Sequence, residues 1–386
     1  MKEFDVAVVG AGPAGSSTAI SLAQQGYHVA LIDRAVFPRD KLCGDFLNPM
    51  NWPVLDELEV SQDIMSCPHH KISAFRITAA DGAEAISALP VSGERQFGLG
   101  VRRLHLDHVL LERAKRLGMS VNEGVKVTGV EGDSRGWRLN MDRGGEHFSA
   151  RTKFLVGADG RNSSVARQLG VASHRTKPSS SIGFEIQLKN VRAVRHSVEI
   201  HQFAGGYAGL LRVDEHRVNL CFTVRQSQLG RTPSFENLRR NLLCDNPFLQ
   251  ALLIDAEPVS ALRSVWPVYF SRRRCFGVGF LLVGDAARVT EPVTGEGIYL
   301  ALRSGQLAAM TIAAALREGN RSLARLSQYD RTCRSEFGAR IRLNSLIRVL
   351  MYRPKLLSLA IRLLGSRKRL LETLVNAVCL PRNAFD

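Results

Sequence analysis

The segment from Asp5 to Arg34 constrains the fold of this 386-residue chain more than any other part of its sequence. The apolar, β-branched run Val6–Val9 predicts a buried strand, and three glycines follow it in GxGxxG spacing. Gly10 permits a tight turn, Gly12 lets the backbone approach a pyrophosphate, and Gly15 lets a helix pack closely on the strand. The segment therefore predicts the start of a Rossmann-like, dinucleotide-binding α/β domain.

The residues around these glycines complete the unit. Pro13 suits the first turn of a helix, where its missing N–H is not needed, and the free N–H groups of that turn face the phosphates. A second strand, His28–Ile32, ends at Asp33, an acid placed to accept hydrogen bonds from an adenosine ribose. We include the neighbouring Ala14 and Arg34 in the expected cofactor site. The unit by itself is compatible with NAD or with FAD.

Two later segments repeat the order of a strand, a Gly/Asp turn and a helix. The first, Lys153–Gly170, contains the pair Asp159-Gly160, and the second, Phe280–Ala309, contains the pair Gly284-Asp285. Asp285 stands at a strand end, where its carboxylate can bind a polyol hydroxyl. A nicotinamide dehydrogenase has no use for this third piece, so the sequence favours FAD.

The third segment also predicts a helix end directed at the cofactor. Pro292 and the loop Gly295-Glu296-Gly297 precede a long apolar helix that begins near Ile298. The N–H groups at the start of that helix can stabilise negative charge on a reduced flavin ring.

All three segments resemble the signatures of the class A flavoprotein superfamily, whose fold is like that of para-hydroxybenzoate hydroxylase. They occur in the order expected in that superfamily and extend over most of the chain. The resemblance implies that Asp33 holds the FAD ribose, that Asp285 holds the ribityl chain, and that Asp159 is structural as much as cofactor-binding. It also implies that Arg103, in the pattern RxxLD, reaches the flavin, and a surface position beside Arg102 is the alternative for this arginine.

Within the superfamily, the chain resembles the geranylgeranyl reductase-like branch. The stretch FPRDKLCGD, Phe37–Asp45, is similar to the FPR-x-K-x-CG segment of that branch, and GEGIYLALRSGQLAA is similar to its GEGI-xx-A-xx-SG-xx-AA. The resemblance implies that Arg39 and Lys41 meet FAD phosphates or an anionic substrate group, and that Gly44 lets the backbone pass close to the flavin ring. Cys43 would then lie near the flavin, as a catalytic thiol or as an inert, buried packing group.

A third match to this branch carries the main departure from it. The strand pair Gly205–Val224 resembles the GGY-x-W-x-FP segment that faces the substrate, but the sequence AGLLR follows Tyr207 in place of the aromatic residue and Phe-Pro. The WxWxIP motif of flavin-dependent halogenases is missing as well, which disfavours halogenation. The departure predicts an aliphatic, glycine-rich and wider pocket wall. The expected pocket residues are Tyr207, Leu211, Phe222 and Trp266.

The remaining pattern predicts a discontinuous α/β fold. We expect a FAD-binding domain made of residues 1–75, 98–170 and 275–320, a mostly antiparallel β-sheet substrate domain made of residues 76–97 and 171–274, and a basic helical C-terminal region, 321–386. Runs typical of strands occur at Ile72–Ile77, Ser181–Leu188, Ser197–Phe203 and Val218–Val224, and the turn Asp81-Gly82 indicates a hairpin. The Rossmann-like FAD domain is therefore interleaved with a sheet that covers the flavin and forms the substrate pocket at the domain interface.

Three hypotheses about function follow. In the first, reduced FAD delivers hydride to a carbon–carbon double bond of a lipophilic small molecule. In the second, reduced FAD and oxygen hydroxylate a phenolic or polyketide substrate. In the third, the chain is a non-enzymatic binding module on the same fold, which the intact phosphate-binding glycines argue against. The sequence has no second GxGxxG motif, so we expect electrons from transiently docked NAD(P)H or from a reduced carrier.

Charge and composition add expectations about partners and location. The net charge is +16, and Arg317–Asp386 holds 15 Lys and Arg against 5 Asp and Glu, which suggests an anionic membrane surface or electron-carrier protein rather than nucleic acid. The periodicity of Leu343–Met351, Leu356–Leu364 and Leu370–Val378 predicts amphipathic helices. We expect the first to cap the FAD domain and the last two to lie in a membrane interface. Scattered cysteines without metal-type spacing, no long apolar run and no signal peptide favour a cytoplasmic protein without metal, peripheral at the membrane.

Overall fold

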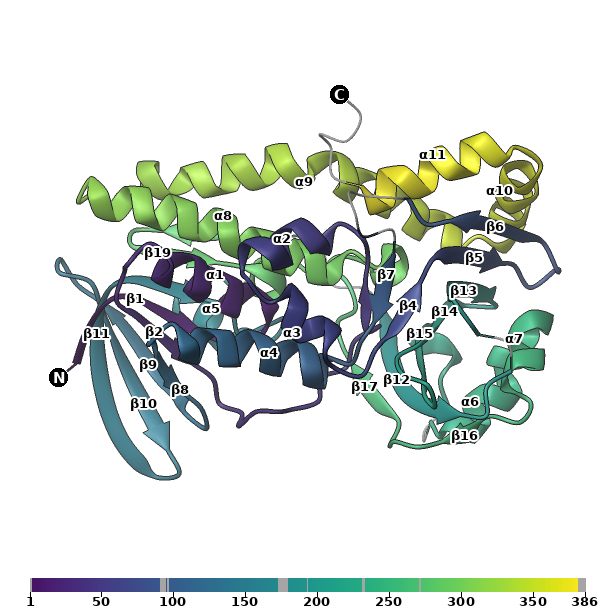
Figure 1. The fold of residues 1–386 in the computed structure, drawn as a ribbon, viewed down its shortest axis with the longest axis horizontal. Coiled ribbons are helices and arrows are strands. Elements are labelled where there is room, and N and C mark those ends of the chain that lie inside the picture. The colour runs from purple at the N-terminus through teal and green to yellow at the C-terminus, as the bar shows by residue number, and fades with distance from the viewer. Residues whose placement is uncertain are drawn as a thin grey trace.

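The computed structural model describes residues 2–90, 95, 97–172, 180–192, 194–230, 233–270 and 272–380. Two large sheets lie next to each other, and the helices of the C-terminal third run along one side of both (Figure 1). Among the described residues, the strands form two eight-stranded sheets and one three-stranded sheet. This is the α/β fold with a helical C-terminal region that the sequence predicts.

The first large sheet contains the glycine-rich turn. Its strand order is β18-β19-β11-β1-β2-β8, with β10 and β9 continuing from β11. The central strand β1 (Lys2–Val9) pairs in parallel with β2 (Val29–Ile32) and with β11 (Glu146–Gly157). The apolar runs of these strands are buried between neighbouring strands and helices, as is typical of parallel sheets. The other strands are β8 (Ser120–Asn122), β9 (Lys126–Gly132), β10 (Trp137–Arg143), β18 (Phe276–Gly277) and β19 (Phe280–Leu282).

The second large sheet has the order β16-β12-β15-β14-β13-β5-β6, with β17 beside β12. Its pairs are antiparallel except for β13 with β5, and the turn at Asp81-Gly82 joins β5 and β6 as the sequence predicts. The strands are β5 (Ala74–Thr78), β6 (Glu84–Ala88), β12 (Ser181–Lys189), β13 (Ser197–Phe203), β14 (Gly206–Arg212), β15 (Val218–Arg225), β16 (Glu257–Pro258) and β17 (Arg263–Val265). The small sheet contains β3 (Phe46–Leu47), β4 (His70–Ile72) and β7 (Gly98–Gly100), and it lies where the two large sheets meet (Figure 1).

Two helices pack closely beside the glycine-rich turn. Helix α1 (Pro13–Ala23) contacts α8 (Gly297–Arg317), and a Cβ added at Gly305 would lie 2.4 Å from the Ala14 carbonyl oxygen. The Ser17 hydroxyl donates a hydrogen bond to the Leu302 carbonyl at 2.7 Å. Among the described residues, α8 alone is long and apolar enough to cross a membrane, but 72% of that stretch is buried inside the protein. It is therefore a core helix in this fold.

The C-terminal helices extend from the first sheet to the second. Helix α9 (Leu323–Met351) runs beside α8, and Pro354 begins α10 (Pro354–Ser366), which α11 (Lys368–Cys379) follows. Both α10 and α11 contact β6 and bury one apolar face. The remaining helices are α2 (Asn51–Glu57), α3 (Ser61–Met65), α4 (Arg103–Arg116), α5 (Ser164–Gln168), α6 (Phe235–Asn241) and α7 (Pro247–Leu253).

Candidate functional site

The glycine-rich turn after β1 has the geometry that the spacing predicts. Gly10 has φ +107°, and its N–H donates to the Ile32 carbonyl at 2.7 Å, so the chain turns sharply at the strand end. A Cβ at Gly15 would lie 1.8 Å from the Gly10 carbonyl oxygen, which leaves room for glycine alone. Helix α1 then begins at Pro13 with no side-chain cap, so its first N–H groups stay free for a ligand.

Gly12 faces open space bordered by positive charge. A Cβ at Gly12 would meet only the guanidinium nitrogens of Arg103 at 3.8 Å and Arg39 at 3.9 Å. Both arginines bind the buried Asp107 carboxylate, Arg103 through two hydrogen bonds of 2.7 Å and Arg39 at 3.0 Å. Although burial opposes the charge on Arg103, Asp107 raises its pKa. Two fixed cations over an open glycine fit a pyrophosphate, as FAD requires.

The two acids of the nucleotide motifs hold backbone in place. Asp33 accepts hydrogen bonds from the Ala11 N–H at 2.7 Å and the Ala35 N–H at 2.9 Å, which ties the end of β2 to the glycine turn. Asp159 accepts from the N–H groups of Ser164 and Val165, at the start of α5, while its buried Oδ1 has no partner among the described residues. The structural role expected for Asp159 is thus present.

The loop between β2 and β3 brings its basic residues to the cofactor side. Lys41 lines the central cavity, and its Nζ lies 3.3 Å from the position of a Cβ on Gly160. Burial and the nearby Arg103 lower the pKa of Lys41. A Cβ added at Gly44 would have no atom within 4 Å, so the chain here is open toward the cavity. Arg34 is exposed and does not line the cavity, so it lies apart from the residues expected near the flavin ring.

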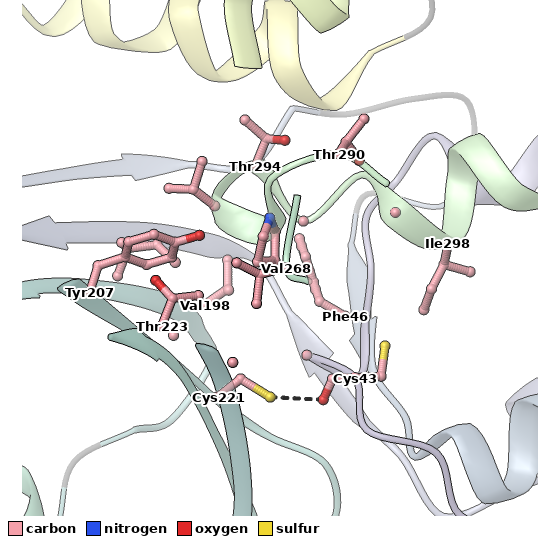
Figure 2. A pocket seen from close by; sticks show the side chains of 18 of the residues that line it. Cys43, Phe46, Val198, Tyr207, Cys221, Thr223, Val268, Thr290, Thr294 and Ile298 are labelled. Atoms are coloured by element: carbon pink, nitrogen blue, oxygen red, sulfur yellow. Dashed lines mark hydrogen bonds between the residues drawn. The ribbon is translucent and has the colours of Figure 1, made fainter. Parts of the chain in front are cut away.

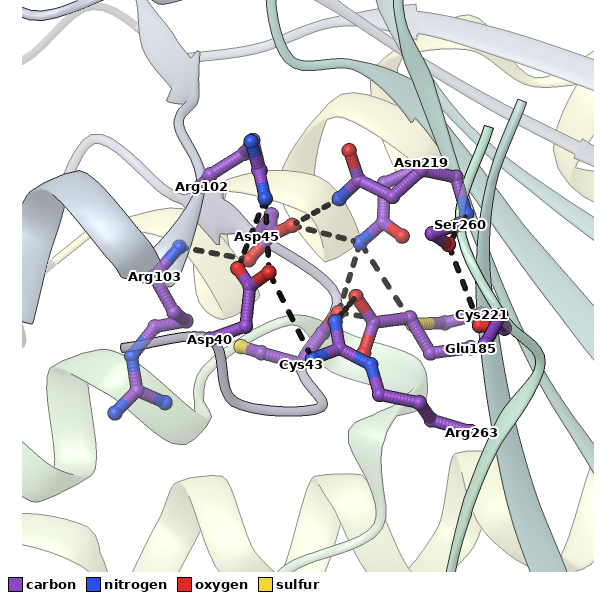
Figure 3. A network of polar contacts seen from close by, with 12 residues as sticks. Asp40, Cys43, Asp45, Arg102, Arg103, Glu185, Asn219, Cys221, Ser260 and Arg263 are labelled. Atoms are coloured by element: carbon purple, nitrogen blue, oxygen red, sulfur yellow. Dashed lines mark hydrogen bonds and ion pairs between the residues drawn. The ribbon is translucent and has the colours of Figure 1, made fainter. Parts of the chain in front are cut away.

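Cys43 is held through its backbone. Its carbonyl oxygen accepts from the Asn219 side-chain amide at 2.8 Å and from the Cys221 thiol at 2.9 Å, both on β15 (Figure 3). Burial raises the pKa of the Cys43 thiol to about 11, so the thiol keeps its proton at neutral pH. Cys43 lines the cavity beside the cofactor-binding turn, where the resemblance places it.

A buried polar network that the motifs did not indicate fixes this loop against the second sheet (Figure 3). Asp45 has φ +54° and accepts from the Arg103 N–H at 3.1 Å and the Asn219 amide at 3.1 Å. Arg263 binds both Glu185, at 2.9 Å, and Asp40, at 4.0 Å. Burial, and then the neighbouring Glu185, raise the pKa of Asp45 well above its ordinary value. An acid next to a Cys-Gly pair was the one sequence signal for this network.

The loop before α8 closes the site from the other side. Asp285 forms an ion pair with Arg161 at 3.3 Å, and the preceding Gly284 has φ +54°. Pro292 begins a 3₁₀ turn that ends at Gly295, where φ is +63° and a Cβ would lie 2.8 Å from the Phe46 ring. Helix α8 then starts at Gly297, close to the predicted start at Ile298, which is buried against the cavity.

We expected Glu296 to bind the cofactor together with the rest of its loop, but its side chain contacts α9 instead. Its carboxylate is buried and pairs with Arg340 of α9 at 3.1 Å. Burial raises the pKa of Glu296, and Arg340 opposes the shift. Glu296 is absent from the cavity lining, so its contribution in this structure is to join the start of α8 to α9.

One cavity of about 350 Å³ joins the cofactor-binding elements to an apolar chamber (Figure 2). Predicted residues at its cofactor end are Gly12, Pro13, Ala14, Lys41, Cys43, Gly44, Arg103, Asp285, Pro292, Gly295, Gly297 and Ile298. Its apolar end is formed by the second sheet and the C-terminal helices, with Phe75, Ile77, Leu89, Val198, Ile200, Leu211, Met351, Leu357, Ile361, Leu364, Leu371 and Val375. The arrangement suits a long apolar ligand whose one end reaches the cofactor.

The predicted substrate wall is partly as expected. Tyr207, Leu211 and Phe222 are buried and line the cavity, whereas the Trp266 side chain is 52% exposed and outside it. The prediction for Trp266 was wrong because its short segment follows the edge strand β17 and turns to the surface. The Tyr207 hydroxyl donates to the buried Glu291 carboxylate at 2.8 Å, and burial raises the pKa of Glu291 to about 7. No motif indicated Glu291.

The family comparison agrees with this geometry. A model of the family described as "FAD binding domain" matches residues 3–342. The chain is 27% identical over 380 residues to conditioned medium factor receptor 1 of Dictyostelium discoideum, covering 94% of this chain and 74% of that protein. It is 30% identical over 353 residues to digeranylgeranylglycerophospholipid reductase 2 of Methanopyrus kandleri, covering 87% and 83%.

Solved structures share the fold at lower identity. A geranylgeranyl bacteriochlorophyll reductase-like protein of Thermoplasma acidophilum superposes with a TM-score of 0.78 at 20% identity, covering 95% of this chain and 91% of that one. The myxobacterial chondrochloren halogenase CndH superposes with a TM-score of 0.80 at 21% identity, covering 89% and 82%. Reductases and halogenases therefore share this architecture, and the residues of the cavity have to distinguish between them.

Proposed function

This chain belongs to the FAD-binding domain family and to its geranylgeranyl reductase-like branch, and we propose that it reduces carbon–carbon double bonds in a long lipophilic chain. It is a FAD-dependent oxidoreductase. FAD, when bound and reduced, supplies the hydride for such a reaction. One observation carries the substrate class: a cavity leads from the phosphate- and flavin-binding residues into a chamber whose apolar walls come from the second sheet and from α9, α10 and α11.

The residues of the chain supply placement and water exclusion in this proposal. Helices α10 and α11 cover the chamber, and their buried faces present Leu357, Ile361, Leu371 and Val375 to it. An isoprenoid-like chain can bury its surface there without leaving a polar group unpaired. Hydroxylation of a phenol is the competing reaction, but a phenolic substrate would leave much of this aliphatic wall without a matching surface.

The outer faces of α10 and α11 support an anionic membrane surface as the partner. Leu356, Leu359, Leu363 and Leu370 are 46–65% exposed, and basic residues are interspersed among them. Basic helices with one exposed apolar stripe bind the interface of anionic bilayers. We propose that the protein is cytoplasmic and peripheral at the membrane, where a lipid substrate enters between these helices.

An anaerobic titration tests the reductase proposal. Purified protein should bind FAD and turn yellow, and dithionite should reduce it. Addition of a digeranylgeranyl glycerophospholipid in mixed micelles should then restore the oxidised flavin absorbance, whereas the fully saturated lipid should not. A protein that stays colourless with added FAD would remove both enzyme hypotheses. Reoxidation by oxygen alone, with a phenol converted to a hydroxylated product, would favour the monooxygenase.

A further inference from the structure

A second cavity of about 310 Å³ lies against the loop that precedes α8. Its walls come from that loop, from α8 and from α9. Four residues line both cavities, namely Asp285, Thr290, Gly297 and Ala301. The second cavity therefore borders the flavin-binding elements, whereas none of the residues of the apolar chamber lines it. Its volume is that of a small-molecule site.

The charges around this cavity are not balanced. Arg272 and Arg334 share the single carboxylate of Asp330, at 2.6 and 2.7 Å. The third arginine, Arg288, lines the cavity from the loop, and its guanidinium has no hydrogen-bond or ion-pair partner among the residues described. The other acid of the wall, Asp285, is already paired with Arg161 at 3.3 Å.

Arg288 is half-buried in the cavity wall, so its guanidinium is only partly hydrated. Burial, and then the nearby Arg272, lower the pKa of Arg288. A guanidinium that loses hydration and faces a second cation gains stability when an anion binds between them. The first turn of α8 adds a partial positive charge, because Gly297 begins that 21-residue helix and lines the same cavity.

We propose that this second cavity binds a phosphate group of a small-molecule anion and that Arg288 is its principal ligand. Guanidinium forks and helix N-termini are the groups that proteins use for phosphate. Two sources supply such a group to this enzyme: a nicotinamide dinucleotide that donates electrons, or the headgroup of a lipid substrate. The lining favours the electron donor, because the cavity borders the flavin-binding loop and shares no residue with the apolar chamber. This inference rests on the proposed FAD-dependent function.

Calorimetric titration of the FAD-loaded protein tests the phosphate site. NADP⁺ should bind the wild type, inorganic phosphate should compete with it, and Arg288→Met should weaken NADP⁺ binding roughly tenfold or more. Arg274→Met is the matched control, since Arg274 is an exposed arginine outside the cavity, and it should leave the affinity unchanged. Arg288→Lys should restore part of the affinity. Equal affinities in the wild type and Arg288→Met, with unchanged FAD content and melting temperature, would overturn the proposal.

Further titrations identify the source of the phosphate and separate this proposal from the proposed function. If glycerol 3-phosphate binds through Arg288 and NADP⁺ does not, the donor is overturned as the source and the phosphate site is retained. If no phosphate compound binds the wild type, the site itself is overturned. Dithionite bypasses the site, so Arg288→Met should still reduce the lipid with dithionite. If the wild type does not reduce the lipid with dithionite, that result counts against the proposed function and not against the phosphate site.

Discussion

At the scale of single residues, the site depends on glycines whose spaces are used in different ways. The Gly10 carbonyl oxygen occupies the space that a side chain at Gly15 would need, whereas the space next to Gly12 is open and faces two guanidinium groups. Gly15 therefore allows close helix packing, and Gly12 leaves space for the ligand. The sequence motif predicts both roles. The structure distinguishes them, because a methyl group added at Gly15 would collide with the backbone and one added at Gly12 would not.

Substitution of Gly12 by Ala should therefore abolish cofactor binding without unfolding the protein. The added methyl fits the protein at 3.8 Å from its nearest neighbour, but it occupies space that the pyrophosphate needs. We expect the melting temperature of the apoprotein to change little and the FAD content to fall at least tenfold, measured by absorbance after gel filtration. Gly230→Ala, at an open surface position, is the control. Normal FAD content in Gly12→Ala would contradict the placement of the pyrophosphate.

Cys43 is a residue whose role the sequence leaves open and for which the structure favours packing over catalysis. The motif leaves a catalytic thiol and a packing thiol open. In the structure the Cys43 carbonyl oxygen accepts hydrogen bonds from β15, and the buried thiol lies beside the Arg103 guanidinium. We predict that Cys43→Ala binds FAD and retains most of the turnover. Alkylation of the wild-type thiol should be slow at neutral pH and rise toward pH 11, because the pKa is raised to about 11. A hundredfold loss of turnover in Cys43→Ala with intact FAD binding would make the thiol catalytic.

Glu291 should make stability depend on pH. Its pKa is about 7 in the fold against 4.5 as the ordinary value, so the folded state holds a proton that the unfolded chain has lost in this range. The free energy of unfolding should fall by roughly 3 kcal/mol as the pH rises from about 4.5 to about 7, and Glu291→Gln should remove this component. Urea unfolding at several pH values measures it, with the exposed Glu215→Gln as control. Parallel pH profiles for the wild type and Glu291→Gln would contradict it.

At the scale of elements, the sequence predicts strands and helices well where one pattern is continuous. Ser197–Phe203 is a strand with the predicted bounds, and α8 begins one residue before its predicted start. The pairing of distant residues could not be predicted. Asn219 donates a hydrogen bond to Asp45, 174 positions away in the sequence. Glu296 pairs with Arg340 of α9, although its loop had suggested a contact with the cofactor. Trp266 was misplaced for the same reason, since composition does not say which edge of a sheet faces a cavity.

The C-terminal helices carry a prediction of their own. Lys368→Glu combined with Arg369→Glu should reduce binding to anionic vesicles, because these two basic residues begin α11 next to the exposed Leu370. Cosedimentation with phosphatidylglycerol vesicles should show at least a tenfold loss at low salt and a smaller difference at high salt. Lys126→Glu with Arg138→Glu, on the exposed face of β9 and β10, matches the charge change elsewhere. Equal losses in the two double variants would indicate net charge rather than a docking face.

At the scale of the whole molecule, the first sheet forms the cofactor site, and the second sheet forms the substrate chamber together with the C-terminal helices. The first sheet presents helix ends, glycines and cations to a dinucleotide, and the second sheet with α10 and α11 forms the apolar chamber. The small sheet and the Asp45 network hold the two parts in register. The fold is shared with halogenases, so the proposed reduction of a lipophilic chain depends on the apolar chamber beneath the C-terminal helices.

Double-bond reduction is best tested by the mass of the product formed under anaerobic conditions. FAD-loaded protein with excess dithionite should convert a digeranylgeranyl glycerophospholipid into products heavier by two hydrogen atoms for each double bond reduced. A variant that narrows the chamber, Gly209→Trp, should keep its FAD and lose this conversion, since Gly209 lines the cavity. An unchanged lipid under these conditions, together with an oxygen-dependent gain of one oxygen atom in a phenolic substrate, would contradict the reductase assignment.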